Sequence, residues 1–277
     1  MPDTIRITVP APPDARDALV ADLADWGFDA FEETDTAVVA YAPAARWDDA
    51  TREAVARRAG GAGWAAEVVE DQDWNATWEA SLRPVVAGPF VIAPSWAEVD
   101  AEHAGLERLV IDPKMAFGTG YHESTRLVLR LLPDAVLPGA RVLDVGTGTG
   151  VLAIAALKLG ASSAVGVDVD PWSVTNGGEN AALNGVQDAF TVREGSVEAV
   201  PETGFDLVLA NIIRSVLVPM LPDLATKARP GAPVVCGGLL ASEREAFVDA
   251  AGGVGLTLER EASENEWWAC SLRRGEL

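Results

Sequence analysis

An apolar segment that runs directly into alternating glycines, "ARVLDVGTGTGVLAIAALKLG" at residues 140–160, constrains the fold of this chain more than any other feature. Residues 140–146 predict a strand, and residues 150–160 predict a helix that ends at Gly160. Glycines between a strand and a helix allow a tight turn in which backbone amides approach a ligand closely. We therefore expect a sheet whose strands alternate with helices, with a binding site at the end of this strand.

The segments after this turn continue the alternation of strand and helix. Strands are expected at residues 163–170, 190–195, 205–211 and 232–238, helices at residues 171–185, 215–228 and 242–253, and a terminal hairpin at residues 255–274. Apolar strands separated by helices of this length predict an α/β fold with a doubly wound, mostly parallel sheet.

The first seventy residues have a different order of elements. Strands are expected at residues 4–10, 28–33, 36–43 and 64–71, and helices at residues 14–27 and 47–61. The order β-α-β-β-α-β is typical of the ferredoxin-like α+β fold. Proteins of many different activities share that fold, so it names no function by itself.

A segment rich in proline and tryptophan separates the two patterns. We expect an N-terminal domain at residues 1–71, a connector at residues 72–106 in which prolines and glycines interrupt regular structure, and a larger domain at residues 107–277. Trp74 and Trp78 stand four residues apart and are interpreted as packing at the domain junction.

The charge of the chain excludes some partners and favours others. The formal net charge is −21, and Lys114, Lys158 and Lys227 are the only lysines. Such a surface repels nucleic acid, whose binding depends on Lys and Arg that neutralise phosphates. It attracts a basic partner, or it is an adaptation to high salt that implies no partner.

Several features point to a cytoplasmic protein without a metal. The N-terminus has no basic start followed by an apolar run, and no stretch approaches the roughly 20 apolar residues of a membrane span. We therefore expect a cytoplasmic location and no membrane contact. Cys236 and Cys270 lie in apolar runs and are expected to be buried free thiols rather than a disulfide or metal ligands.

Two ligands suit the glycine turn: a dinucleotide or S-adenosylmethionine. Asp168 follows the second strand of the sheet, where a carboxylate can accept from both hydroxyls of a ribose. The dinucleotide fingerprint has the spacing G-x-G-x-x-G, whereas Gly146, Gly148 and Gly150 give G-x-G-x-G. Asp144 precedes them and can hold the ammonium of S-adenosylmethionine, directly or through water. The spacing favours the methyl donor.

Four motifs together resemble one family. "DPKMAFGTGYHEST", "VLDVGTGTGVLAIAALKLGA", "VGVDVDP" and "LVLANI", with the tryptophan- and proline-rich segment before them, are similar to the ribosomal protein L-eleven methyltransferases (PrmA). The resemblance extends from about residue 72 to the end of the chain, and over the first seventy residues it is one of architecture only.

This resemblance implies a class I S-adenosylmethionine-dependent methyltransferase with a seven-stranded sheet and a small substrate-recognition domain. Its substrate would be a basic ribosomal protein of the large subunit, methylated on lysine side chains and on the N-terminal α-amine. By matching motif, the cofactor contacts fall on Thr125, Gly146, Asp168 and Asn211. The chain departs from the family's usual pattern at Tyr121 and at Ser124.

The loop of residues 117–125 is interpreted as a lid over the cofactor. Gly118 and Gly120 allow close backbone approach, and Thr125 can donate its hydroxyl to the amino-acid end of the cofactor. Phe117 can shield the reacting centre from water, with core packing as the alternative. His122 is expected to cap or brace the following helix, or else to transfer a proton.

Asn211 ends a strand beside the expected position of the methyl group. Its side-chain oxygen, or a nearby carbonyl, can accept a hydrogen bond from an incoming amine. Ile212 and Ile213 follow it, so no planar side chain is present to stack on a nucleobase. We therefore assign catalysis to Asn211 and Phe117, and cofactor binding to Thr125, Asp144, Gly146, Gly148, Asp168 and Asn211, with no metal.

Other functions stay open at this point. A methyltransferase of another protein's lysines and a nicotinamide-dependent oxidoreductase both fit a sheet of this type. A binding module that has lost turnover is a third alternative, although Asp144, Asp168 and Asn211 are intact. A nucleic-acid methyltransferase is disfavoured by the negative charge.

Overall fold

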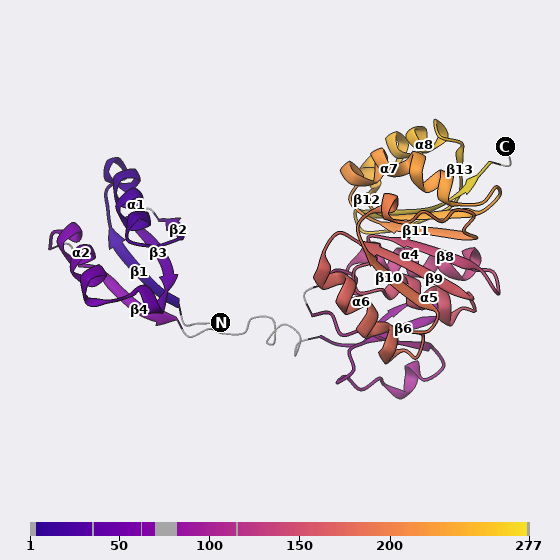
Figure 1. Cartoon of the computed structure of the whole chain (residues 1–277), viewed down its shortest axis with the longest axis horizontal. Helices are drawn as coiled ribbons and strands as arrows, with labels where there is room; N and C mark the ends of the chain where they lie inside the picture. The colour runs from indigo at the N-terminus through magenta and orange to yellow at the C-terminus, as the bar shows by residue number, and fades with distance from the viewer. Residues whose placement is uncertain (1–3, 35, 62, 70–81, 115, 276–277) are drawn as a thin grey trace. The chain divides into compact units, whose positions relative to one another are not determined.

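The structure is a computed structural model that describes residues 4–34, 36–61, 63–69, 82–114 and 116–275. The chain forms two compact units, Met1–Ala76 and Thr77–Leu277 (Figure 1). Trp74 and Trp78, which were expected to pack at a junction, lie outside the described residues.

The first unit is a four-stranded antiparallel sheet with two helices. Its elements are β1 (Thr4–Pro10), α1 (Arg16–Asp25), β2 (Ala30–Glu33), β3 (Ala37–Pro43), α2 (Asp49–Ala59) and β4 (Ala65–Val69). The strand order is β2-β3-β1-β4, which confirms the ferredoxin-like prediction. Alternate residues of β1 are buried, so Ile5 and Ile7 pack with Leu19 and Leu23 of α1 in one core.

The second unit contains the predicted seven-stranded sheet. Its strands are β8 (Arg141–Val145), β9 (Ser163–Asp168), β10 (Phe190–Glu194), β11 (Leu207–Asn211), β12 (Pro233–Leu240), β13 (Leu256–Glu264) and β14 (Trp267–Arg274). The order is β10-β9-β8-β11-β12-β14-β13. The first five strands of that order are parallel, and β14 runs antiparallel to both of its neighbours. The prediction of a mostly parallel, doubly wound sheet is confirmed.

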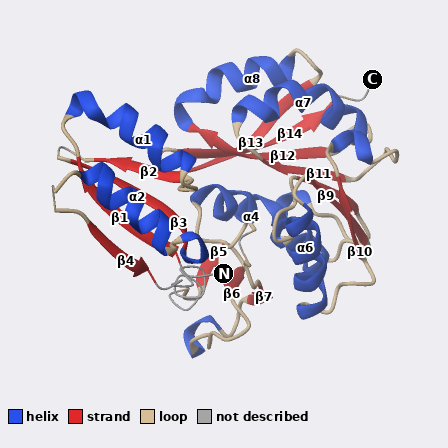
Figure 2. Ribbon diagram, turned by 60° about the vertical axis from the view of Figure 1, so that its left-hand side comes forward, coloured by secondary structure: helices blue, strands red, loops and turns tan. Residues whose placement is uncertain are grey.

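Helices cover both faces of this sheet. They are α4 (Glu123–Ala135), α5 (Val151–Lys158), α6 (Pro171–Leu183), α7 (Arg214–Lys227) and α8 (Arg244–Gly252). In Figure 2, α7 and α8 lie on one face, and α4 and α6 lie on the other. Side chains alternate between the two faces along β11. Leu207 and Leu209 lie in the core with α4 and α5, and Val208 and Ala210 lie in the core with α7 and α8.

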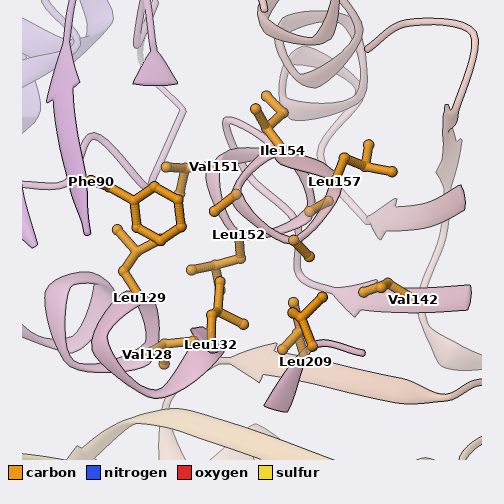
Figure 3. Packing of buried hydrophobic residues seen from close by; sticks show 14 of the residues in the cluster. Phe90, Val128, Leu129, Leu132, Val142, Val151, Leu152, Ile154, Leu157 and Leu209 are labelled. Carbon is orange, nitrogen blue, oxygen red and sulfur yellow. The ribbon is translucent and has the colours of Figure 1, made fainter. Parts of the chain in front are cut away.

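Close packing beneath α4 and α5 fixes the first of these layers. Leu129 and Leu132 of α4 and Leu152 of α5 lie above Leu209 of the sheet (Figure 3). Phe90 packs at the edge of the same cluster. Each of these residues is at most 4% exposed, so α4 and α5 pack closely on this face of the sheet.

The predicted connector of residues 72–106 contains regular structure in part of its described residues. Strands β5 (Val85–Ala87) and β6 (Phe90–Ala93) form a hairpin in the second unit, whereas residues 94–106 contain no strand. Strand β7 (Glu107–Val110) then pairs with β6 in parallel. The glycine and proline between the first two strands form the hairpin turn, with Gly88 at a φ of +58°. Strands of three and four residues are too short for a clear alternating pattern.

Two further expectations concern the cysteines and membrane-spanning helices. Cys236 and Cys270 are free and buried, as predicted, and they face each other across the β12–β14 pair. Among the residues that the structure describes, no helix is long and apolar enough to cross a membrane.

Candidate active site

A cavity of about 600 Å³ lies at the carboxyl ends of β8, β9 and β11; we call it the main cavity. Ligands of open α/β sheets bind in this position, where the strand order reverses around the first strand. Five predicted site residues line it, namely Phe117, Gly146, Gly148, Asp168 and Asn211. Its other lining residues are His122, Ser124, Val145, Val169, Asp170, Ser173, Gly195, Ser196, Ile212, Ile213, Val216, Met220, Gly238 and Trp267.

The glycine turn after β8 requires glycine for two reasons. Gly146, Gly148 and Gly150 all have positive φ, at +69°, +53° and +81°. In addition, a Cβ at Gly148 would stand 2.2 Å from the carbonyl oxygen of Phe117, which is closer than any real contact. The backbone amide of Thr149 donates to that same oxygen at 2.8 Å. The backbone of the turn therefore contacts the backbone of the loop before α4 directly.

The glycines of that loop have a different role from the predicted one. A Cβ at Gly118 would lie 2.7 Å from the Thr149 hydroxyl, and a Cβ at Gly120 would lie 3.1 Å from the Ile92 side chain. Both glycines thus allow the loop to approach other parts of the protein, and neither lines the main cavity. Only the ring of Phe117, which is 56% exposed, extends from this part of the loop into the cavity wall.

Asp168 connects the end of β9 to the glycine turn. Its Oδ2 accepts from the Gly148 amide at 2.8 Å, and its Oδ1 accepts from the Asp170 amide at 3.0 Å. Each carboxylate oxygen has more than one lone pair, so both can still accept from a ligand's hydroxyls. The position of Asp168 in the cavity wall fits the predicted contact with a ribose.

Asp144 does not lie in the cavity. Its side chain is fully buried beneath the turn, where Oδ2 accepts from the Thr147 hydroxyl at 2.7 Å and from the Ala153 amide at 3.3 Å. Burial raises the pKa of Asp144 to about 7. The carboxyl therefore has no exposed surface in the cavity wall, and its hold on a cofactor ammonium, directly or through water, stays a prediction. Asp144 also braces the turn that forms the cavity floor.

A hydrogen bond joins Thr125 to Asn211, which lines the cavity. Thr125 is fully buried and lies outside the cavity wall, so its direct contact with the cofactor stays a prediction. Its Oγ1 accepts from Asn211 Nδ2 at 3.3 Å. Asn211 Oδ1 is buried without a hydrogen-bond partner among the described residues, and a Cβ at Gly237 would stand 2.7 Å from it. Thr125 therefore orients Asn211, which does line the cavity.

Three aromatic rings form the wall near Asn211. The ring centroids of Phe117 and His122 are 5.4 Å apart, and those of His122 and Trp267 are 4.4 Å apart with a T-shaped geometry. His122 is the N-cap of α4, because its side chain accepts from the Ser124 amide. The predicted capping role of His122 is confirmed.

The sequence interpretation missed Trp267. Adjacent strand residues face opposite sides of a sheet, and Trp268 packs in the core with α7 and α8. Trp267 consequently faces α4 and the main cavity. The paired tryptophans at the start of the last strand were the signal that could have identified it.

Comparison with known proteins identifies the family. Residues 23–275 match the family described as "Ribosomal protein L11 methyltransferase (PrmA)". This chain belongs to the ribosomal protein L11 methyltransferase family. A relative with this name from Porphyromonas gingivalis is 37% identical over 268 residues, which are 92% of this chain and 89% of the relative. Another, from Symbiobacterium thermophilum, is 43% identical over 205 residues, which are 74% of this chain and 66% of the relative.

A solved structure from the same family supports the fold. The ribosomal protein L11 methylase from Lactobacillus delbrueckii subsp. bulgaricus is 29% identical, with a TM-score of 0.65, over 70% of this chain and 100% of that chain. Membership of the L11 methyltransferase family confirms the resemblance seen in the sequence. It also supports the predicted activity, that of a protein methyltransferase with S-adenosylmethionine as the methyl donor.

The main cavity has the size and donor set that this cofactor needs. Its volume of about 600 Å³ falls within the range of small-molecule sites. The Asp168 carboxylate lies in its wall, where it suits the predicted ribose contact. A Cβ at Gly146 would stand 2.9 Å from the Ile212 side chain, so glycine leaves space between the turn and the opposite wall. The residues of this L11 methyltransferase family member therefore fit S-adenosylmethionine.

Proposed function

We propose that this chain methylates lysine side chains and the N-terminal α-amine of a basic ribosomal protein of the large subunit, in the cytoplasm. The relatives' names identify ribosomal protein L11 as the substrate to test. The observation that carries the proposal is the main cavity, in which Asp168 and Asn211 lie at the ends of different strands with the glycine turn between them.

The donor site follows from that arrangement. Asp168 accepts from the ribose hydroxyls, and Gly146 and Gly148 let the donor's amino-acid end lie against the turn. In the structure, Asp144 lies beneath the turn and Thr125 contacts Asn211, so each also supports the site from behind the cavity wall.

The reaction requires the protein chiefly to align the amine with the methyl group. S-adenosylmethionine supplies a methyl group that a sulfonium already activates; the new N–C bond forms as the S–C bond breaks. The chain must hold a neutral amine in line with that bond and exclude water. Free lysine amines have a pKa near 10.4 and α-amines near 7.7–8.0, so the amine must first lose a proton to water. Apolar surroundings favour the neutral form.

Asn211 and Phe117 are the residues that we assign to this step. Asn211 accepts a hydrogen bond from the amine once its side chain turns Oδ1 from its buried place beside Gly237 toward the cavity, which releases the contact of Nδ2 with Thr125. Phe117 covers the reacting centre with an apolar ring. Ile212 and Ile213 continue the apolar wall, so a flexible aliphatic amine suits this end better than a planar base.

The relatives' names give the partner, and the charge is compatible with it. A net charge of −21 favours a basic protein and disfavours direct binding of nucleic acid. We assign recognition of that protein to the first unit and chemistry to the second, with no membrane involved. Lysines of another basic protein are the alternative substrate.

One assay tests the proposal against its main competitor. The protein is titrated with S-adenosylmethionine and separately with NAD in a calorimeter, and then incubated with methyl-labelled donor and purified L11. The expected result is saturable binding of the donor alone and label in the protein. Binding of NAD without binding of S-adenosylmethionine would refute the proposed function.

A further inference from the structure

A second cavity, of about 430 Å³, is formed by the loop before α4; we call it the loop cavity. It is lined by Ala116, Phe117, Gly118, Thr119, Tyr121, His122 and Glu123. Phe117 and His122 also line the main cavity. The two cavities therefore meet at this pair of rings, which are inclined by 57° to each other.

Of the two rings, Phe117 is the one that is free to turn. His122 is held from two sides, because its Nδ1 lies 2.8 Å from the Ser124 hydroxyl and its ring packs against Trp267. The Phe117 ring is 56% exposed and its one ring contact among the described residues is with His122. Its backbone is fixed by Thr149, so a change of side-chain rotamer opens the boundary without moving the loop.

A carboxylate stands in the wall of the loop cavity. The Glu123 side chain is 27% exposed, and its Oε1 accepts from Asn265 Nδ2 at 3.1 Å. Arg126 lies 3.6 Å from the same oxygen, but it binds Glu264 more closely, at 3.0 Å through Nε. A hydrogen bond from its own backbone amide lowers the pKa of Glu123, which keeps the group ionised at neutral pH. The wall of the loop cavity thus contains the negative charge of Glu123 beside the rings of Phe117 and His122.

We propose that the loop cavity is the docking site for the substrate's cationic amine, which reaches the main cavity between Phe117 and His122. This inference rests on the proposed function. An ammonium on a slender aliphatic chain pairs with Glu123 and then passes the faces of the rings, which attract cations. It gives its proton to water as it leaves the carboxylate, and it arrives beside Asn211 as the neutral nucleophile.

The open mouth of the main cavity is the alternative route. Its exposed rim is apolar, with Val169 at 72%, Ile213 at 60% and Val216 at 45% exposure. The carboxylate in that wall, Asp168, is occupied by the donor's ribose in the proposed function. Among the described residues that line the main cavity, the other charged group is Asp170, which caps α6 through the Trp172 amide. The loop cavity offers the better match for a cation.

Two variants and one control test this route. Thr119→Phe fills the loop cavity without touching the main cavity, and Glu123→Gln removes the charge while keeping an acceptor for Asn265. Glu245→Gln, on exposed α8, removes an acid that lines neither cavity. For each protein, the Kd for S-adenosylmethionine and the kcat and KM for purified L11 are measured, and the thermal midpoint is recorded.

We expect Thr119→Phe to lower kcat/KM for L11 roughly tenfold or more, with a donor Kd within about twofold of wild type. Glu123→Gln should raise the KM for L11 by roughly threefold or more at low salt, an effect that molar salt removes. Glu245→Gln should match wild type. Wild-type kinetics in both loop-cavity variants would overturn the inference. Absence of transfer by the wild-type protein, with donor still bound, would refute the proposed substrate instead.

Discussion

The Thr149 backbone amide donates a hydrogen bond of 2.8 Å to the Phe117 carbonyl oxygen, so the loop before α4 and the glycine turn after β8 share one backbone contact. Gly148 makes this contact possible, because any side chain there would occupy the place of that carbonyl. The wall and the floor of the main cavity are consequently coupled.

Replacement of Gly148 by Ala tests the coupling. A Cβ at a φ of +53°, 2.2 Å from a backbone oxygen, must displace the loop. We expect a loss of about 1–3 kcal/mol in the free energy of unfolding. Affinity for S-adenosylmethionine should also fall roughly tenfold or more, measured by calorimetry.

Gly178→Ala is the matched control for that change. Gly178 lies within α6 and has no atom within 4 Å of an added Cβ. This variant should gain about 0.5–1 kcal/mol of stability, as expected for alanine in a helix, and should bind the donor as wild type does. If both variants bind the donor equally well, the loop and the turn are not coupled.

Asp168→Ala is expected to weaken donor binding. The ribose hydroxyls lose a charged acceptor, a loss worth about 1.5–3 kcal/mol, or roughly a 10- to 100-fold rise in Kd. Asp188→Ala, in an exposed turn, controls for the loss of one carboxylate. An unchanged Kd in folded Asp168→Ala would rule out the ribose contact.

The buried carboxyl of Asp144 predicts a pH dependence of stability. Its pKa is about 7 in the folded protein, because burial disfavours the charged form, against about 3.9 in the unfolded chain. The folded state therefore retains a proton that the unfolded state releases. Its contribution to stability is fully present below about pH 4 and is lost as the pH rises to 7, by up to about 4 kcal/mol.

Asp144→Asn removes this titration while preserving an acceptor for Thr147 and Ala153. Urea unfolding of both proteins between roughly pH 4.5 and 8, a range that extends past the folded pKa of Asp144, should give similar stabilities at the acid end. Towards pH 8 the variant should become the more stable protein. Two curves that stay parallel across this range would show that Asp144 does not titrate as expected.

The separate roles proposed for the two units can be tested by truncation. A fragment of residues 77–277 contains the whole main cavity and the whole loop cavity. It should bind S-adenosylmethionine with the Kd of the full chain but lose most of its kcat/KM on L11. If the fragment methylates L11 at the rate of the full-length chain, residues 1–76 do not recognise the substrate.

Salt dependence separates the two explanations of the acidic surface. If the negative charge steers a basic substrate, kcat/KM for L11 falls as salt shortens the Debye length, which is roughly 8 Å at physiological ionic strength. If it is an adaptation to high salt, stability and kcat/KM rise together in molar salt, because screening relieves repulsion among carboxylates. We expect the second trend, since three lysines in 277 residues is a property of the whole chain. A flat profile would contradict both.

Most of the fold was predictable because its pattern is strongly periodic. The central strands β8, β11 and β12 are mostly apolar and end in clear turns, and β1 alternates along its length. The short strands β5 and β6 were not predictable in this way. Each holds its place through tertiary packing, as Phe90 does beneath α4 and α5, and a run of four residues carries no periodicity that reveals it.

The sequence motifs located the site, but they did not show which side chains line the cavity. Glycine spacing and the acid after β9 identified the ligand pocket, because those features act through the backbone of one strand–turn–helix unit. Burial decided the rest. Asp144 and Thr125 belong to the motifs, yet the fold places both behind the wall, and Trp267 enters the cavity from a strand more than a hundred residues later.

The most direct test of the account is the chemical identity of the product. Purified L11 is incubated with this protein and S-adenosylmethionine carrying a deuterated methyl group, and the peptides are then mapped by mass spectrometry. We expect deuterated methyl groups on lysine ε-amines and on the α-amine of L11, and strongly reduced transfer by Asp168→Ala at limiting donor. Labelled methyl groups in ribosomal RNA, with none in the protein, would contradict it.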